Sequence, residues 1–169
     1  VRRMRWKQES APTPGPRRRY ARSTLPSIRA SEDDTVTGHQ QPNRLLLWID
    51  AGGGYLVCLD DYVVLGQPTP GQPIALPIMA DLSRRHAAIR REGGAYVLEP
   101  VHETRLDDRD LTGPTVLSDQ QIIQLGDRVQ LRFRKPHALS STARIDFVTN
   151  HKTQPSADGV LLMADSCVI

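Results

Sequence analysis

Apolar and polar residues alternate along most of the chain after residue 43, and a period of two predicts β-strands. Val129, Leu131 and Phe133, for example, alternate with polar or basic neighbours, which predicts one apolar face and one basic face. The strands predicted in this way are 44–49, 55–59, 62–65, 86–90, 95–98, 120–125, 128–134, 144–148 and 160–163. No segment shows a sustained period of 3.6 residues with caps at both ends. Short strands separated by frequent turns are typical of an all-β sandwich.

Glycine, proline and aspartate separate these strands. Residues 51–54 contain three glycines and end the first strand, and Asp60-Asp61 predicts a polar connection between the second and third strands. Residues 68–73 contain three prolines, which is too many for a central strand, so a surface loop is expected there. The sequence Glu-Gly-Gly at 92–94 predicts the tight turn of a hairpin.

The first 42 residues are expected to form a disordered basic tail. They mix Arg, Pro, Ser, Thr and Gln with almost no apolar periodicity, so folding would not offset the entropy lost on ordering them. Residues 1–30 carry nine Lys or Arg and one acidic residue, whereas residues 31–169 carry 13 basic and 18 acidic ones. Contact of this tail with nucleic acid is one alternative. A solvated linker is the simpler interpretation.

The strand-like segments in residues 136–169 have two interpretations. Aligning residues 54–64 with 159–169 matches a glycine, a leucine, an aspartate and a valine, which favours the opening strands of a second, similar domain that would continue beyond residue 169. Alternatively, these strands extend the first sheet and resemble its strands by chance. In both cases we expect the chain to end on an apolar strand with an unpaired edge, through which it could self-associate.

Composition argues against several classes of function. Cys58 and Cys167 both lie in apolar runs, so neither a disulfide framework nor a zinc site is expected. No apolar run approaches the roughly 18 residues of a membrane span, so we expect a soluble, cytoplasmic protein without membrane contact. Residues 52–54 lack the Gly-Lys-Ser/Thr ending of a phosphate loop, and Ser83 with His86 lacks an orienting acid. Catalysis, cofactors and metals are therefore not expected.

One stretch carries a more specific signal. Residues 81–89, Asp-Leu-Ser-Arg-Arg-His-Ala-Ala-Ile, run from a polar loop into an alternating strand; Leu65-Gly66-Gln67 precedes them, and Leu125-Gly126-Asp127 follows. This trio resembles the forkhead-associated (FHA) domain over roughly residues 43–135. The resemblance implies an antiparallel β-sandwich whose loops bind phosphothreonine. It thus implies a non-catalytic protein–protein interaction module that recognises phosphothreonine peptides in Ser/Thr-kinase signal transduction.

The resemblance also implies roles for individual residues. Ser83 matches the serine whose hydroxyl contacts the phosphate, and Arg84 follows at a position that often contacts the peptide. Arg85 is interpreted as a solvent-facing residue. The phosphopeptide-binding residues implied are Ser83, Arg84, Gln67, Thr104 and His102. The structural residues implied are Gly66, His86, Gly126 and Asp127, with His86 bracing the loops.

The sequence departs from the family pattern in the phosphate-binding loops. Gln67 replaces the arginine of the Gly-Arg pair, and hydrogen bonds to charged groups contribute about 1.5–3 kcal/mol against roughly 1 kcal/mol for neutral ones. Arg84 could return that charge. Glu103 and Asp107-Asp108 replace uncharged loop residues of the family and would place negative charge beside an anion site. The alternative function is therefore an FHA-like scaffold that has lost phosphate binding and serves assembly or phosphate-independent protein binding.

The tail also offers a candidate ligand for the same site. Thr35 and Thr37 follow the acidic run Glu32-Asp33-Asp34 and are candidate phosphorylation sites. A phosphothreonine there could bind the Ser83 loop of the same molecule or of a neighbour, and a short tether gives a high effective concentration. An ordinary acidic linker is the alternative.

Overall fold

The computed structural model describes residues 41–137 and 140–164, and the regular secondary structure of these residues consists of strands. The basic tail expected in residues 1–42 lies outside the described residues except for its last two. No helix of the described residues is long and apolar enough to cross a membrane.

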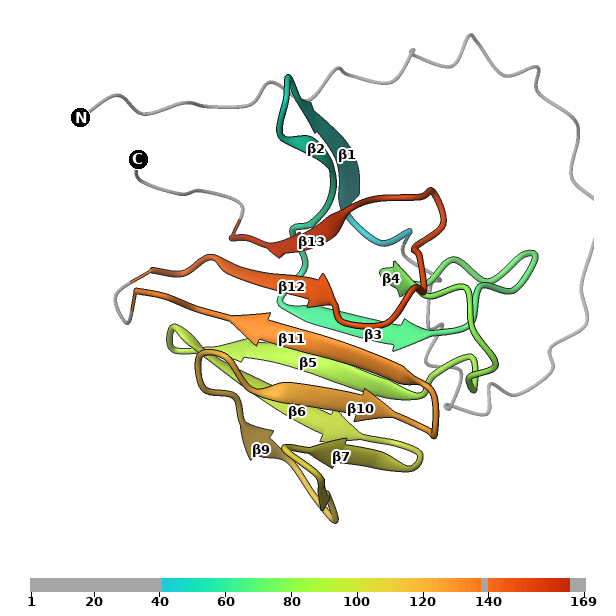
Figure 1. Cartoon of the computed structure of the whole chain (residues 1–169), viewed down its shortest axis with the longest axis vertical. Helices are drawn as coiled ribbons and strands as arrows, with labels where there is room; N and C mark the ends of the chain where they lie inside the picture. Colours follow the sequence, from blue (N-terminus) through green and yellow to red (C-terminus); the bar gives the residue numbers. More distant parts are fainter. Residues whose placement is uncertain (1–40, 138–139, 165–169) are drawn as a thin grey trace, which may run out of the picture.

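The strands form two sheets of unequal width (Figure 1). The eight-stranded sheet has the order β1 (Arg44–Ile49), β2 (Gly53–Cys58), β13 (Gly159–Leu162), β12 (Ala143–Phe147), β11 (Val129–Arg134), β10 (Ile122–Leu125), β7 (Thr104–Leu106) and β8 (Arg109–Asp110). The five-stranded sheet has the order β4 (Leu76–Pro77), β3 (Tyr62–Gly66), β5 (Ala87–Glu92), β6 (Ala95–Pro100) and β9 (Thr115–Val116). The expected all-β sandwich is confirmed.

Two pairings correct the expectation of a purely antiparallel sandwich. β13 runs parallel to β2, and β4 runs parallel to β3, whereas the other strand pairs are antiparallel. A hairpin connects only antiparallel strands, and parallel neighbours need a longer connection. β2 and β13 satisfy this condition because most of the domain lies between them in the sequence.

The core lies between the sheets and follows the predicted alternation. In β11, Val129, Leu131 and Phe133 are buried while Arg132 is exposed. Tyr96 of β6 packs its ring edge-on against Phe133, with 5.6 Å between ring centroids. Edge-on aromatic pairs are favourable because the positive ring edge meets the negative ring face. This pair links the two sheets at the centre of the core.

The C-terminal strands extend the first sheet, as the second interpretation of residues 136–169 expected. β12 pairs with β11, and β13 lies between β12 and β2 with Gly159 opposite Tyr55. The Tyr96 hydroxyl also donates to the carbonyl oxygen of Leu162, at 3.1 Å, which ties β13 to the opposite sheet. The expectation that the last strand has an unpaired edge is wrong for β13, because neighbours pair with both of its sides. The edge strands of this sheet are instead β1 and β8.

Candidate functional site

The end of β3 meets the loop that leads into β5 through a close backbone contact. Gly66 is the last residue of β3 and is buried, and the Gln67 amide donates to the Ser83 carbonyl at 3.2 Å. A β-carbon added to Gly66 would lie 2.5 Å from the carbonyl carbon of Arg84 and closer still to its oxygen. Real β-carbons essentially never approach atoms that closely, so only glycine fits at this point of contact.

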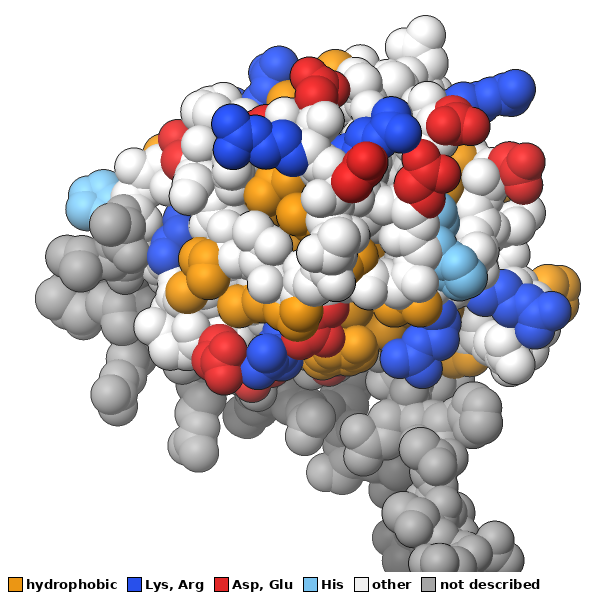
Figure 2. Space-filling model, turned by 90° about the horizontal axis from the view of Figure 1, so that it is seen from below, with side chains coloured by type: hydrophobic (Ala, Val, Ile, Leu, Met, Phe, Trp, Pro, Cys, Tyr) orange, Lys and Arg blue, Asp and Glu red, His pale blue; other side chains and the backbone are white. Residues whose placement is uncertain are grey.

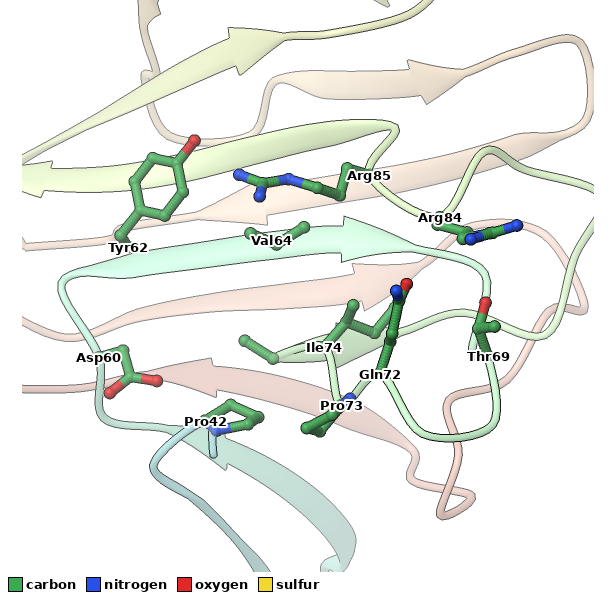
Figure 3. Close-up of a pocket in the computed structure, with 11 residues that line it drawn as sticks. Pro42, Asp60, Tyr62, Val64, Thr69, Gln72, Pro73, Ile74, Arg84 and Arg85 are labelled. Carbon is green, nitrogen blue, oxygen red and sulfur yellow. The ribbon is translucent and has the colours of Figure 1, made fainter. Parts of the chain in front are cut away.

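The turn at Arg84 and Arg85 carries two free cations at the surface. Both side chains are exposed, and neither forms an ion pair with an acidic side chain of the described residues. They diverge from the turn, so that Arg85 extends toward Tyr62 while Arg84 extends toward Thr69 (Figure 3). This arrangement places positive charge on both sides of the turn.

An open depression of about 630 Å³ lies beside this turn. It is lined by Gln67, Gln72, Leu82, Ser83, Arg84, Arg85, Val101 and His102. The structure therefore brings together four of the five residues implied for phosphopeptide binding, although they come from three separate loops. None of the residues that line this depression is acidic.

Thr104 is the fifth of these residues, and the structure places it below the surface. Its side chain is buried, and its hydroxyl donates to the carbonyl oxygen of His102 at 2.9 Å. A buried hydroxyl that already donates to its own loop is not available to a ligand in the depression. Thr104 instead stabilises the loop that presents His102.

His86 braces the same loop from beneath. Its Nε2 lies 2.8 Å from the carbonyl oxygen of Glu103, and a carbonyl only accepts, so Nε2 donates. The His86 carbonyl accepts from the amides of Val101 and His102, at 3.1 and 2.9 Å. Nδ1 is buried without a hydrogen-bond partner among the described residues. These contacts support the architectural role expected for His86.

The turn after β10 also supports the loop that carries His102 and Glu103. Gly126 has a φ of 55°, in the left-handed region that favours glycine, and its amide donates to the Glu103 carbonyl at 3.0 Å. Asp127 lies exposed in the same turn, and its carboxylate makes no hydrogen bond to the described residues. The left-handed backbone thus explains why a glycine lies at position 126. Nothing in the structure explains the aspartate at position 127.

Two of the three acidic residues expected near the site, Glu103 and Asp107, are engaged in contacts elsewhere. Glu103 forms an ion pair with Arg105 at 3.0 Å, and Arg105 also pairs with Asp110 at 2.7 Å. Asp107 and Asp108 both have positive φ values, 48° and 64°, in the tight turn between β7 and β8. The Asp107 carboxylate accepts from the backbone amide at the start of β10, at 2.9 Å. On the face seen in Figure 2, basic and acidic side chains are interspersed around apolar ones.

A second cavity, of about 350 Å³, adjoins the depression (Figure 3). It is lined by Pro42, Asp60, Tyr62, Val64, Thr69, Gln72, Pro73, Ile74, Ala75, Arg84 and Arg85. Gln72, Arg84 and Arg85 line both spaces, so the two form a continuous surface around the Arg84 turn. The walls of this cavity are largely apolar. Its single acid, Asp60, accepts a hydrogen bond from the Asn43 amide at 2.9 Å.

Arg85 and Gln72 also line the site, beside the residues implied by the sequence. Arg85 faces solvent, as expected, and it also lines both spaces. Gln72 lies in the proline-rich loop predicted at the surface, and no local pattern shows that this loop folds against the Arg84 turn. Only the tertiary contact reveals it.

Metal binding and thiol reactivity depend on how the His, Cys, Asp and Glu side chains are placed. No group of three or more His, Cys, Asp or Glu side chains among them could hold a metal ion. Cys58 is buried, and its burial raises the pKa of the thiol to about 12, which keeps the thiol protonated at neutral pH. Such a thiol is a poor nucleophile.

A comparison with protein-family models agrees with the resemblance found in the sequence. Residues 63–126 match the family model of the FHA domain. The solved structure described as "Rv0020c_FHA Structure" is similar at 26% sequence identity with a TM-score of 0.34, and the likeness covers 53% of this chain and 91% of that one. The comparison with curated proteins finds no match. The family match includes most of β3, the Ser83 loop, the His102 loop and Gly126, and it confirms the resemblance for this part of the chain.

Proposed function

Because residues 63–126 match the family model of the FHA domain, we propose that this protein binds phosphothreonine peptides in the depression beside Ser83 and the Arg84–Arg85 turn. FHA domains are interaction modules that bind phosphothreonine-containing proteins. The finer proposal is that this chain does so without the arginine of the Gly-Arg pair, using Ser83, Arg84, Gln67 and His102. It would act in Ser/Thr-kinase signalling in the cytoplasm.

The observation that carries this proposal is the pair of free arginines next to the Ser83 hydroxyl. A phosphothreonine carries close to two negative charges at neutral pH and three acceptor oxygens. Arg84 can supply a charge-assisted donor, and Ser83 and Gln67 can supply neutral donors from the same depression. Because neither arginine is bound to an acid within the described residues, a phosphate would not have to displace an existing ion pair.

The adjoining cavity supports binding of an extended peptide rather than of phosphate alone. Tyr62, Val64 and Ile74 form apolar walls, and the cavity opens next to Arg84. A peptide whose phosphothreonine lies in the first depression could place a neighbouring apolar side chain there. We therefore expect some preference for apolar residues close to the phosphothreonine.

The test is binding of the full chain to a degenerate phosphothreonine peptide library, with the unphosphorylated library as reference. Ser83→Ala should lower the affinity about tenfold or more, since a hydrogen bond to a charged group contributes about 1.5–3 kcal/mol. Ser156→Ala is the matched control, because Ser156 is exposed and lies outside both cavities. Binding that does not depend on phosphate would favour the alternative of a scaffold for assembly or phosphate-independent protein contacts.

A phosphorylated Thr35 or Thr37 is the ligand that we propose within the chain itself. Both threonines lie outside the described residues. Phosphorylation of either threonine would place a candidate ligand on the tail that precedes β1. Hydrogen exchange around Ser83 should then slow in the phosphorylated protein. Equal exchange with and without the phosphate would exclude this ligand.

A further inference from the structure

The two sheets differ in width, and the wider sheet overhangs the narrower one. The eight-stranded sheet continues past the core to the β1–β2 hairpin, which projects from the sandwich (Figure 1). β1 pairs with β2 on one side, and no described strand pairs with its other side. It is therefore the free edge of a sheet, a position that natural proteins usually protect with charged residues, proline or a covering segment.

β1 is not protected in this way, because its exposed residues are large and apolar. The exposed fractions are 46% for Leu45, 38% for Leu47, 68% for Trp48 and 47% for Ile49. Leu45, Leu47 and Ile49 project from one face of the strand and Trp48 from the other, since side chains alternate along a strand. Apolar groups are thus exposed on both faces of the same edge.

The backbone of β1 is also available for pairing. The Leu59 amide donates to the Asn43 carbonyl at 2.9 Å, which makes residues 43 and 59 a hydrogen-bonded pair of the β1–β2 ladder. Such pairs alternate along an antiparallel ladder. The amides and carbonyls of residues 45, 47 and 49 therefore point toward β2, whereas those of residues 44, 46 and 48 point toward the free edge.

We propose that β1 pairs antiparallel with β1 of a second copy of this chain, around a two-fold axis at Leu47. The facing residues are then Arg44 and Asp50, Leu45 and Ile49, and Leu46 and Trp48, each with its counterpart in the second copy. Apolar side chains meet along the centre of this interface, and a two-fold axis through Leu47 requires the two strands to run antiparallel. Arg44 keeps its hydrogen bonds to the carbonyl oxygens of Ile74 and Ala75, at 2.8 and 3.2 Å, at the end of the interface. Residues 46 and 48 both direct their backbone groups to the edge, so they form hydrogen-bonded pairs in this register.

This surface differs from the one expected from the sequence. The C-terminal strand was expected to provide the unpaired edge, but β13 has neighbours on both sides and β1 does not. The dimer joins two eight-stranded sheets edge to edge and leaves the Ser83 depression uninvolved, because none of the residues lining that depression belongs to β1.

Sedimentation of the full chain over a wide concentration range tests the dimer. We expect a reversible monomer–dimer equilibrium that Leu47→Lys weakens at least tenfold. Val116→Lys is the matched control, because Val116 is exposed on β9, the edge strand of the other sheet, and should leave the equilibrium unchanged. A wild-type protein that stays monomeric at every concentration, or an equal effect of both variants, would overturn the proposal.

Cysteine cross-linking tests the register and does not depend on how well the lysine variant folds. In a Cys167→Ser background, Leu47→Cys should form an intermolecular disulfide under mild oxidation, because residue 47 faces itself across the axis at a separation that suits a disulfide. Leu45→Cys should not cross-link to itself, but it should cross-link to Ile49→Cys in a mixture of the two proteins. Equal self-cross-linking of the residue 45 and 47 variants would refute the register.

Discussion

Gly66→Ala is expected to damage both the fold and the ligand site, because one methyl group would occupy space held by the Ser83 loop. The added β-carbon would lie 2.6 Å from the Ser83 carbonyl oxygen and 2.5 Å from the Arg84 carbonyl carbon. Those groups are backbone atoms, and the Arg84 carbonyl oxygen would lie closer still to the added β-carbon, so the whole turn has to move by about 1 Å to restore normal contacts. The movement strains the hydrogen bond from the Gln67 amide to Ser83.

The expected loss of stability follows from two contributions. Forcing an extra carbon into a packed site costs typically about 1–3 kcal/mol, and weakening one backbone hydrogen bond costs about 1 kcal/mol more. A total of about 2–4 kcal/mol should lower the midpoint of thermal unfolding by roughly 5–15 °C for a domain of this size. Phosphopeptide affinity should fall as well, since Ser83 and Arg84 belong to the displaced turn.

Thermal and urea unfolding followed by circular dichroism would measure this loss. Gly113→Ala is the control, because a β-carbon there meets no atom within 4 Å and its φ is not in the left-handed region. That variant should stay within about 0.5 kcal/mol of the wild type. If Gly66→Ala were as stable as Gly113→Ala and still bound phosphopeptide, the contact at Gly66 could not be what positions the Ser83 loop.

Three further predictions concern other parts of the site and the core. Gln67→Arg should raise phosphopeptide affinity by between about twofold and thirtyfold in calorimetric titrations, because it replaces a neutral donor by a charged one. His86→Phe should accelerate amide hydrogen exchange in residues 101–104 and lower stability by about 1–3 kcal/mol, since the Glu103 carbonyl loses its Nε2 donor. Cys58 should resist alkylation at pH 8 in the folded protein and react on unfolding, as mass spectrometry of the peptide around it would show. Its raised pKa also implies that this thiol leaves stability unchanged below about pH 9 and lowers it between pH 9 and 12, where the unfolded thiol ionises first.

Each of these predictions has an outcome that contradicts it. An unchanged affinity of Gln67→Arg for phosphopeptides would mean that residue 67 does not reach the phosphate. Wild-type exchange rates at residues 101–104 in His86→Phe would show that the ring does not hold this loop. Rapid alkylation of folded Cys58 would require the strand around it to open far more often than its burial suggests.

Local sequence patterns determined the class of fold and the identity of the loops. The alternation in residues 129–133 was sufficient to predict β11 and its buried face, because a period of two follows directly from strand geometry. Gly66, Ser83 and His86 were recognised because they lie in short motifs that resemble those of the FHA domain. The contacts of Gly66 and His86 are nevertheless with other loops, Gly66 with the Ser83–Arg84 backbone and His86 with the Glu103 carbonyl. The short strands β4, β7, β8 and β9 were not predicted, since two or three residues are too few to show a period.

The tertiary structure decided which strands lie side by side and which residues share the site. An alternating pattern shows that a strand has an apolar face but not which strand lies next to it, so β13 could not be distinguished from a free edge and β1 could not be recognised as one. The same limit explains Thr104, whose burial depends on the packing of β7 against β10, and Gln72, whose loop reaches the Arg84 turn only in the folded chain. Neighbours in the fold are set by contacts between distant segments, and no local property of the sequence contains that information.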